Sequence, residues 1–103
     1  MVIAGYVDID PRKIGGRVAG RPVVGPERIM RARGVVADVY VDDKIVEYIL
    51  DLVEATREPK AFDLADLEPL IAFGASPRAG IFLTRAAKAH AFLRGRAYAI
   101  PDD

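Results

Sequence analysis

Apolar positions are spaced most regularly in the middle of the chain. Between Asp42 and Pro59 they recur at intervals of three and four residues, which places them on one face of an α-helix. These positions are Ile45, Tyr48, Ile49, Leu52, Val53 and Thr56. Asp42 or Asp43 can cap the start of this helix, and Glu58-Pro59 ends it, because the residue before a proline disfavours helical backbone angles. Tyr48 is expected in the core.

A second helix is predicted toward the C-terminal end. The string Gly74-Ala75-Ser76-Pro77 precedes it, and serine is a favoured N-cap and proline a favoured first helical residue. One face then carries Ala79, Phe82, Leu83, Ala86, His90 and Leu93. Gly95 supplies the left-handed conformation that ends the helix. Phe82 is expected in the core, and His90 is expected to be packed or hydrogen-bonded rather than to bind a ligand.

Shorter elements are predicted around these helices. They are a strand over residues 2–9, a helix over 26–38, an extended link at 40–41, a helical turn within 60–73 capped by Asp63, and a strand over 97–100. Residues 12–25 are rich in arginine and glycine and are expected to form a basic, flexible loop. Pro101-Asp102-Asp103 is typical of a helix start, so the natural protein is expected to continue. The predicted fold is mainly α, a small helical bundle with short extended segments at both ends.

The composition excludes several classes of partner and binding site. The chain has 103 residues, with 15 basic and 15 acidic side chains, and this balance gives no global attraction to nucleic acid. It has no cysteine and one histidine, which excludes thiolate and histidine-rich metal sites, so no metal ligands are expected. No apolar run approaches the roughly 20 residues of a membrane span, and no secretion signal is evident. A cytoplasmic protein is expected, without a nucleic-acid partner or a membrane span.

Catalytic motifs are missing from the sequence. It contains no Walker-type phosphate loop, no Ser/His/Asp set and no metal-binding H-E-x-x-H motif. The unusual residue is Arg78, at the second position of the predicted C-terminal helix, where the helix dipole disfavours a cation by about 0.3–1 kcal/mol. Unpaired backbone donors beside a guanidinium form a good anion site. The alternative is that Arg78 pairs with an acid such as Glu68 or points into water.

Several strings, in order, resemble the C-terminal lid of MoxR-family AAA+ ATPases. They are V-Y-V-D-D from Val39, E-A-T-R-E-P from Glu54, G-A-S-P-R-A from Gly74, A-A-K-A-H-A from Ala86 and P-D-D from Pro101. The resemblance covers residues 26–103, and G-A-S-P-R-A is its most specific part. Residues 1–25 match poorly and are expected to be the end of the ATPase core or a connector. The lid is expected to be truncated at its C-terminus.

The resemblance implies a role for individual residues. In this family a helical lid packs over a nucleotide held by a separate α/β core, and a sensor 2 arginine at a helix start reaches the terminal phosphate. Arg78 matches that arginine, and Ser76 and Pro77 would position it. Arg57 also matches the family pattern; a structural or inter-subunit role and a solvated helix-end charge remain open. The resemblance places no catalytic residue in this segment.

The resemblance also implies partners for the full-length parent. They are ATP and Mg, the parent's own AAA+ core, a homo-oligomeric ring, expected to be a hexamer, and a protein with a von Willebrand factor A-type domain. The implied activity is ATP hydrolysis coupled to chaperone-like assembly of protein complexes. Because this chain lacks Walker A and Walker B motifs, we expect no catalysis and no tight ATP binding by it alone.

Two alternatives belong to other classes. The first is a stand-alone helical interaction module without a nucleotide role, which predicts that Arg78 is held in a salt bridge within the domain. The second is a small nucleic-acid-binding domain using the basic stretch at residues 12–33, which the zero net charge and the lack of interleaved aromatic residues disfavour. A lid predicts instead that Arg78 projects from a helix start on an open surface.

Overall fold

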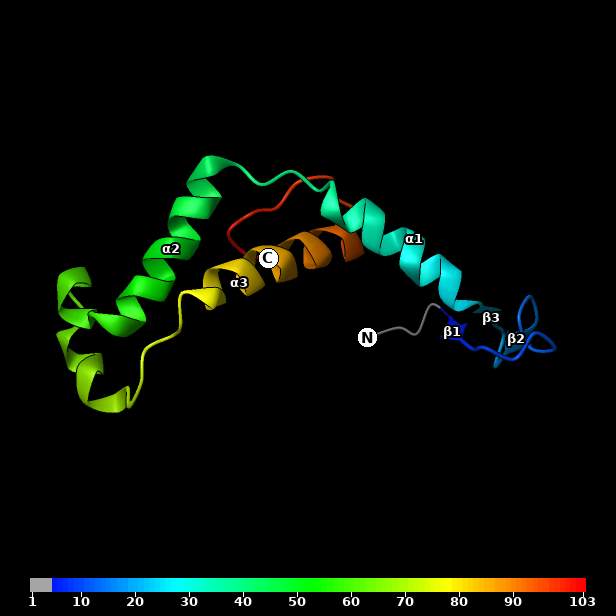
Figure 1. The fold of residues 1–103 in the computed structure, drawn as a ribbon, viewed down its shortest axis with the longest axis horizontal. Coiled ribbons are helices and arrows are strands. Elements are labelled where there is room, and N and C mark those ends of the chain that lie inside the picture. The colour runs from blue at the N-terminus through cyan, green and yellow to red at the C-terminus, as the bar shows by residue number, and fades with distance from the viewer. Residues whose placement is uncertain (1–4) are drawn as a thin grey trace. The chain divides into compact units, whose positions relative to one another are not determined.

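The computed structural model describes residues 5–103, which form two compact units divided between Val35 and Val36 (Figure 1). The boundary falls inside helix α1 (Pro26–Ala37), which begins at the residue predicted and ends one residue earlier than expected. Pro26 fits the first helical position because its missing N–H would have no partner there. The part of the predicted N-terminal strand before Gly5 lies outside the described residues.

The N-terminal unit contains a small three-stranded sheet, in the order β1-β3-β2. Strand β1 (Tyr6–Val7) pairs in parallel with β3 (Arg21–Val24), and β2 (Arg17–Val18) pairs with β3 in antiparallel orientation. Ala19 and Gly20 join β2 to β3 with positive φ angles of 48° and 75°, as the central residues of a type I′ hairpin do. The prediction of a flexible loop over residues 12–25 is therefore wrong, because here Gly20 serves a tight turn.

The C-terminal unit is built on two α-helices, α2 (Asp43–Arg57) and α3 (Arg78–Leu93), which pack against each other (Figure 1). Asp42 caps α2 as predicted, since its carboxylate accepts a hydrogen bond of 2.9 Å from the Lys44 N–H. Gly95 ends α3 with a φ of 73°, also as predicted. The predicted fold class, a mainly α, small helical bundle, is confirmed.

The core of this unit is small and made of short side chains. Its buried apolar residues are Val39, Ile49, Val53, Ala87, Ala91 and Ala99. The expected core positions Tyr48 and Phe82 are 43% and 61% exposed, and Leu93 is 79% exposed, so their prediction as core or inward-facing residues is wrong. On α3 the buried positions are Ala87 and Ala91, each one residue after the predicted Ala86 and His90, because small residues allow the close approach of the backbones.

Between α2 and α3 the chain forms two 3-10 helices, η1 (Pro59–Phe62) and η2 (Ala65–Leu70). Pro59 is buried and is the first residue of η1. It follows the C-cap residue of α2, Glu58, so the 3-10 helix begins directly where α2 stops. Asp63 was predicted to cap the start of a helix, and this prediction is wrong. Asp63 follows η1 in the left-handed conformation, with a φ of 56°, and its N–H donates to the Pro59 carbonyl at the end of that turn.

The segment after α3 returns to the start of the unit. Tyr40 and Tyr98 form an isolated parallel bridge, in which the Tyr40 N–H donates to Ala97 O and the Ala99 N–H to Tyr40 O, both at 2.9 Å. The sequence predicted an extended link at residues 40–41 and a strand over 97–100. The structure has a single β-bridge there instead, between Tyr40 and Tyr98. Residues 101–103 form a turn. Within residues 5–103, no helix is long and apolar enough to cross a membrane.

Candidate functional site

The end of α2 and the segment before α3 are fastened together. The Thr56 hydroxyl donates to the Val53 carbonyl at 2.7 Å and accepts a hydrogen bond of 2.8 Å from the Ala75 N–H. Gly74 lies against the same turn: a Cβ there would stand 2.6 Å from Arg57 Cγ and 2.8 Å from Arg57 Cα and Thr56 O. The fold therefore brings together the A-T-R and G-A-S-P-R-A strings, which are far apart in the sequence.

Helix α3 begins at Arg78, directly after this junction. Pro77 already has helical angles, with φ −56° and ψ −26°, and the Ala79 N–H donates to the Ser76 carbonyl at 2.9 Å. Ser76 was expected to cap the helix with its hydroxyl, but no side-chain capping bond forms at this start. The physical reason is that the Ser76 carbonyl satisfies the first-turn donor, and the N-cap position is taken by Pro77, whose side chain has no acceptor.

The Arg78 side chain is exposed. The ion pairs found among residues 5–103 do not include Arg78, and the acid considered as its partner, Glu68, pairs instead with Lys60 at 2.7 Å. The intramolecular salt bridge that an interaction module predicts is thus not seen in the described part of the chain. The guanidinium projects from the first residue of a 16-residue helix into solvent.

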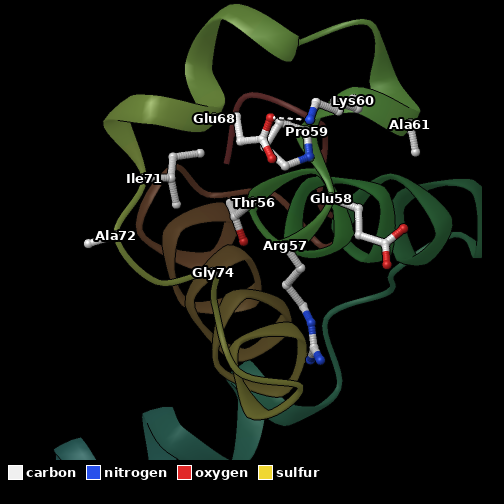
Figure 2. Close-up of a pocket in the computed structure, with 10 residues that line it drawn as sticks. All are labelled: Thr56, Arg57, Glu58, Pro59, Lys60, Ala61, Glu68, Ile71, Ala72 and Gly74. Atoms are coloured by element: carbon white, nitrogen blue, oxygen red, sulfur yellow. Dashed lines mark ion pairs between the residues drawn. The ribbon is translucent and has the colours of Figure 1, made fainter.

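Arg57 lies at the last residue of α2, between two hollows of the surface. One, of about 670 Å³, is bounded by Thr56, Pro59, Lys60, Glu68 and Gly74 among others. Figure 2 shows Thr56 facing Gly74, the Lys60–Glu68 ion pair across the hollow, and the Arg57 side chain extending away from that pair. The other, of about 400 Å³, is bounded by Leu50, Val53, Glu54, Arg57, Glu58 and Pro77. Arg57 and the start of α3 therefore border the same hollow.

Two residues of this junction, Thr56 and Gly74, were not identified as site residues from the sequence. Thr56 was assigned to the apolar face of α2, and Gly74 only to the string before the helix. A glycine preceding a predicted cap indicates a close backbone approach in general terms. Nothing in the sequence indicates that the backbone approached is the end of α2, because the contact joins residues separated by the whole η1–η2 segment.

A second polar cluster lies at the other end of α3. The buried carboxylate of Asp103 accepts from Arg96 Nη1 at 2.6 Å, from Arg96 Nη2 and from the Ile100 N–H at 2.7 Å, and lies 2.8 Å from His90 Nδ1. The expectation that His90 is packed or hydrogen-bonded is confirmed. The hydrogen bonds from Arg96, ahead of those from Ile100 and His90, hold the pKa of Asp103 far below its usual range, although burial raises it.

The Arg78 guanidinium is the kind of donor that binds an anion. Residues 5–103 contain no group of three or more His, Cys, Asp or Glu side chains placed to hold a metal. Arg78 presents a planar guanidinium with several N–H donors, which matches the geometry of phosphate oxygens. The chemistry of this donor suits a phosphate group.

Comparison with known proteins bears on the same segment. Residues 65–103 match the AAA lid domain family. The chaperone MoxR1 of Mycobacterium tuberculosis is 39% identical over 75 residues, 73% of this chain and 20% of that protein. Protein MoxR of Paracoccus denitrificans is 40% identical over 76 residues, 70% of this chain and 22% of that protein. The crystal structure of a candidate ATPase from Cytophaga hutchinsonii matches with a TM-score of 0.72 at 36% identity, covering 80% of this chain and 25% of that one.

The fold and the matched family define a lid domain of the AAA+ class. Within that class, the chain belongs to the lid region of the MoxR family of AAA+ ATPases. It spans about a fifth to a quarter of the length of these relatives, as the shares of 20%, 22% and 25% state.

Proposed function

We propose that this chain closes over ATP held by a separate AAA+ core and that Arg78 is its sensor 2 arginine, contacting the terminal phosphate. The observation that carries the proposal is the exposed guanidinium at the first residue of α3, on a helix start fixed to the end of α2. The helix dipole makes a cation at a helix start mildly unfavourable. A bound phosphate has the charge that the dipole favours, and it accepts charge-assisted hydrogen bonds from the guanidinium.

The contact depends on the nucleotide state. With ATP bound, the guanidinium holds the lid onto the core through the terminal phosphate. After hydrolysis and phosphate release this contact is lost, so the lid is free to move. Ser76 and Pro77 position Arg78 through the backbone, because Ser76 accepts the first-turn hydrogen bond and Pro77 restricts φ. Arg57, exposed beside the same helix start, is the candidate for a contact with a neighbouring subunit.

The remaining parts belong to the full-length protein. We propose that its AAA+ core supplies the Walker motifs and binds ATP and Mg, that it assembles into a homo-oligomeric ring of six, and that it acts in the cytoplasm. The chaperone name of the MoxR1 relative supports chaperone-like assembly of protein complexes as the output. A partner carrying a von Willebrand factor A-type domain is part of the same proposal.

Substitution of Arg78 tests the sensor role. In the full-length ATPase, Arg78→Ala is expected to lower kcat for ATP hydrolysis by about 10- to 100-fold, the range for losing a hydrogen bond to a charged group. The preference for ATP over ADP should fall with it. Arg78→Lys keeps the charge but loses the planar fork, so its kcat should lie between the two. Stability should change by less than about 0.5 kcal/mol, because the side chain is exposed.

Arg85→Ala is the matched control, since it removes another exposed arginine from the same helix. It should leave hydrolysis unchanged. Hydrolysis by the Arg78→Ala enzyme at the wild-type rate would remove the sensor assignment and favour an interaction module without a nucleotide role.

A further inference from the structure

The Thr56 hydroxyl joins α2 to the segment that leads into α3. It lies in the last turn of α2 and donates back to the Val53 carbonyl at 2.7 Å, which fixes its rotamer. With its remaining lone pairs it accepts from the Ala75 N–H at 2.8 Å. Thr56 and Ala75 are both partly buried, so this hydrogen bond is sheltered from water.

Only Ser76 and Pro77 separate this anchor from Arg78. Pro77 has a fixed φ, here −56°, and Gly74 on the other side of the anchor is pressed against Arg57 and Thr56. The backbone between Ala75 and Arg78 therefore has little freedom of its own. A shift of the Ala75 N–H relative to α2 is transmitted to the first turn of α3 and to the direction in which the guanidinium points.

We infer that Thr56 is the positioning residue for Arg78: its hydroxyl holds the start of α3 on the end of α2, and so sets how the lid presents its arginine to the terminal phosphate. The inference rests on the proposed sensor role. It assigns to the threonine of the A-T-R string a function that is separate from the burial of the apolar face of α2.

Thr84 provides a matched control. Its hydroxyl is also partly buried in a helix and donates back to a main-chain carbonyl, that of Gly80, at 2.8 Å. No hydrogen bond from outside its own helix is accepted by Thr84 within the described residues. Thr84→Val therefore removes a helical hydroxyl of the same kind without touching the junction before Arg78.

The experiment measures kcat, KM and the ratio of ATP to ADP affinity for Thr56→Val, Thr56→Ser and Thr84→Val in the full-length ATPase, each alone and combined with Arg78→Ala. Thr56→Val keeps the branched shape and loses both hydrogen bonds. Because misplacement of a positioned group is costly, we expect Thr56→Val to lower kcat about tenfold and to weaken the preference for ATP, with Thr56→Ser within about twofold of the wild type. Thr84→Val should hydrolyse ATP normally.

The double variant separates positioning from general damage. If Thr56 acts through Arg78, then Thr56→Val adds little to the loss already caused by Arg78→Ala. In the 103-residue chain, amide exchange at Ala75 should be faster in Thr56→Val than in the wild type or Thr84→Val. Should Thr56→Val fail to fold, Thr56→Ala removes the same two hydrogen bonds without a new methyl group beside Ala75 and carries the same expectations.

The outcomes distinguish the two proposals. Multiplicative losses from Thr56→Val and Arg78→Ala, or wild-type hydrolysis by Thr56→Val while Arg78→Ala is impaired, would overturn the role of Thr56 and leave the sensor role standing. Wild-type hydrolysis by Arg78→Ala would overturn the sensor role, and the positioning role with it.

Discussion

Asp103 has an environment very different from that of a free side chain. Its side chain is 0% exposed. The two carboxylate oxygens nevertheless have polar partners, which are the Arg96 guanidinium, His90 Nδ1 and the Ile100 N–H. An ionised carboxylate only accepts hydrogen bonds, and the donors around Asp103 come from a side chain and from the backbone. The same contact raises the pKa of Arg96, chiefly through the hydrogen bond with Asp103. The cluster fixes the segment after Gly95 to the end of α3.

This cluster should make the stability of the C-terminal unit depend on pH. The pKa of Asp103 is lowered in the folded state, so the unfolded chain binds a proton more readily. The stabilisation is complete above the ordinary aspartate pKa of about 3.9 and is lost as the pH falls through and below that value. Urea unfolding at pH 7 and near pH 3 should show the loss, and Asp103→Asn should reduce the difference. Asp102→Asn, at the exposed neighbour, should not; an equal effect of both variants would contradict the assignment.

At the scale of elements, Thr56 and Gly74 hold the end of α2 against the segment that leads into α3. The hydrophobic spacing predicted both helices. Both ends of α2 and the end of α3 agree with the capping and breaking residues, whereas the Ser76 side chain does not cap α3 as predicted. The junction itself was not predicted, because its contacts are between Thr56–Arg57 and Gly74–Ala75, which only the path of η1 and η2 brings together. Close approach at Gly74, rather than unusual backbone angles, is the constraint there.

Paired glycine substitutions test this constraint. Gly74→Ala should destabilise the unit by about 1–3 kcal/mol, because the added Cβ would overlap two backbone atoms of α2. Gly80→Ala lies in α3, where a Cβ meets only Leu50 Cδ2 at 3.8 Å, and should stabilise it by up to about 1 kcal/mol through helix propensity. Chemical denaturation of both variants measures the difference. Equal stabilities would show that Gly74 has room for a side chain.

At the scale of the whole molecule, much apolar surface stays exposed. Within the C-terminal unit, Leu70 is 78% exposed, Phe73 92% and Phe82 61%. A small domain buries a modest fraction of its surface, but large aromatic side chains in solvent are characteristic of a surface that another domain covers. The proposed core of the ATPase is the natural occupant, since these side chains come from η2, α3 and the segment between them, next to Arg78 in the sequence.

Phe73→Ala tests whether this surface is used. Because the side chain is 92% exposed, the free energy of unfolding of the 103-residue chain should change by less than about 0.5 kcal/mol. In the full-length ATPase the same change should lower hydrolysis or ring assembly, measured by phosphate release and by sedimentation. Ile49→Ala, at a residue 6% exposed, is the contrasting variant and should destabilise the chain by about 2–5 kcal/mol. Unchanged assembly and hydrolysis in Phe73→Ala would leave this surface without a role.

The sequence by itself determined several local features of this protein, though not the caps expected at Asp63 and Ser76. Helical spacing, the Asp42 cap, the break at Glu58-Pro59 and the stop at Gly95 depend on neighbouring residues, and each is found where it was predicted. The order of the family strings identified the lid region and singled out Arg78. Such features are readable because backbone angles and capping are decided within a few residues.

Tertiary structure alone decided which surfaces are buried and what lies beside Arg78. Phe82 and Leu93 are strongly apolar but exposed, whereas Ala87 and Ala91 are buried, because contact between α2 and α3 selects side chains that fit and not those that are most hydrophobic. Gly20 serves the tight turn between β2 and β3, and β3 has partners on both sides. Thr56 reaches Ala75 because the chain between these two residues folds back onto the end of α2.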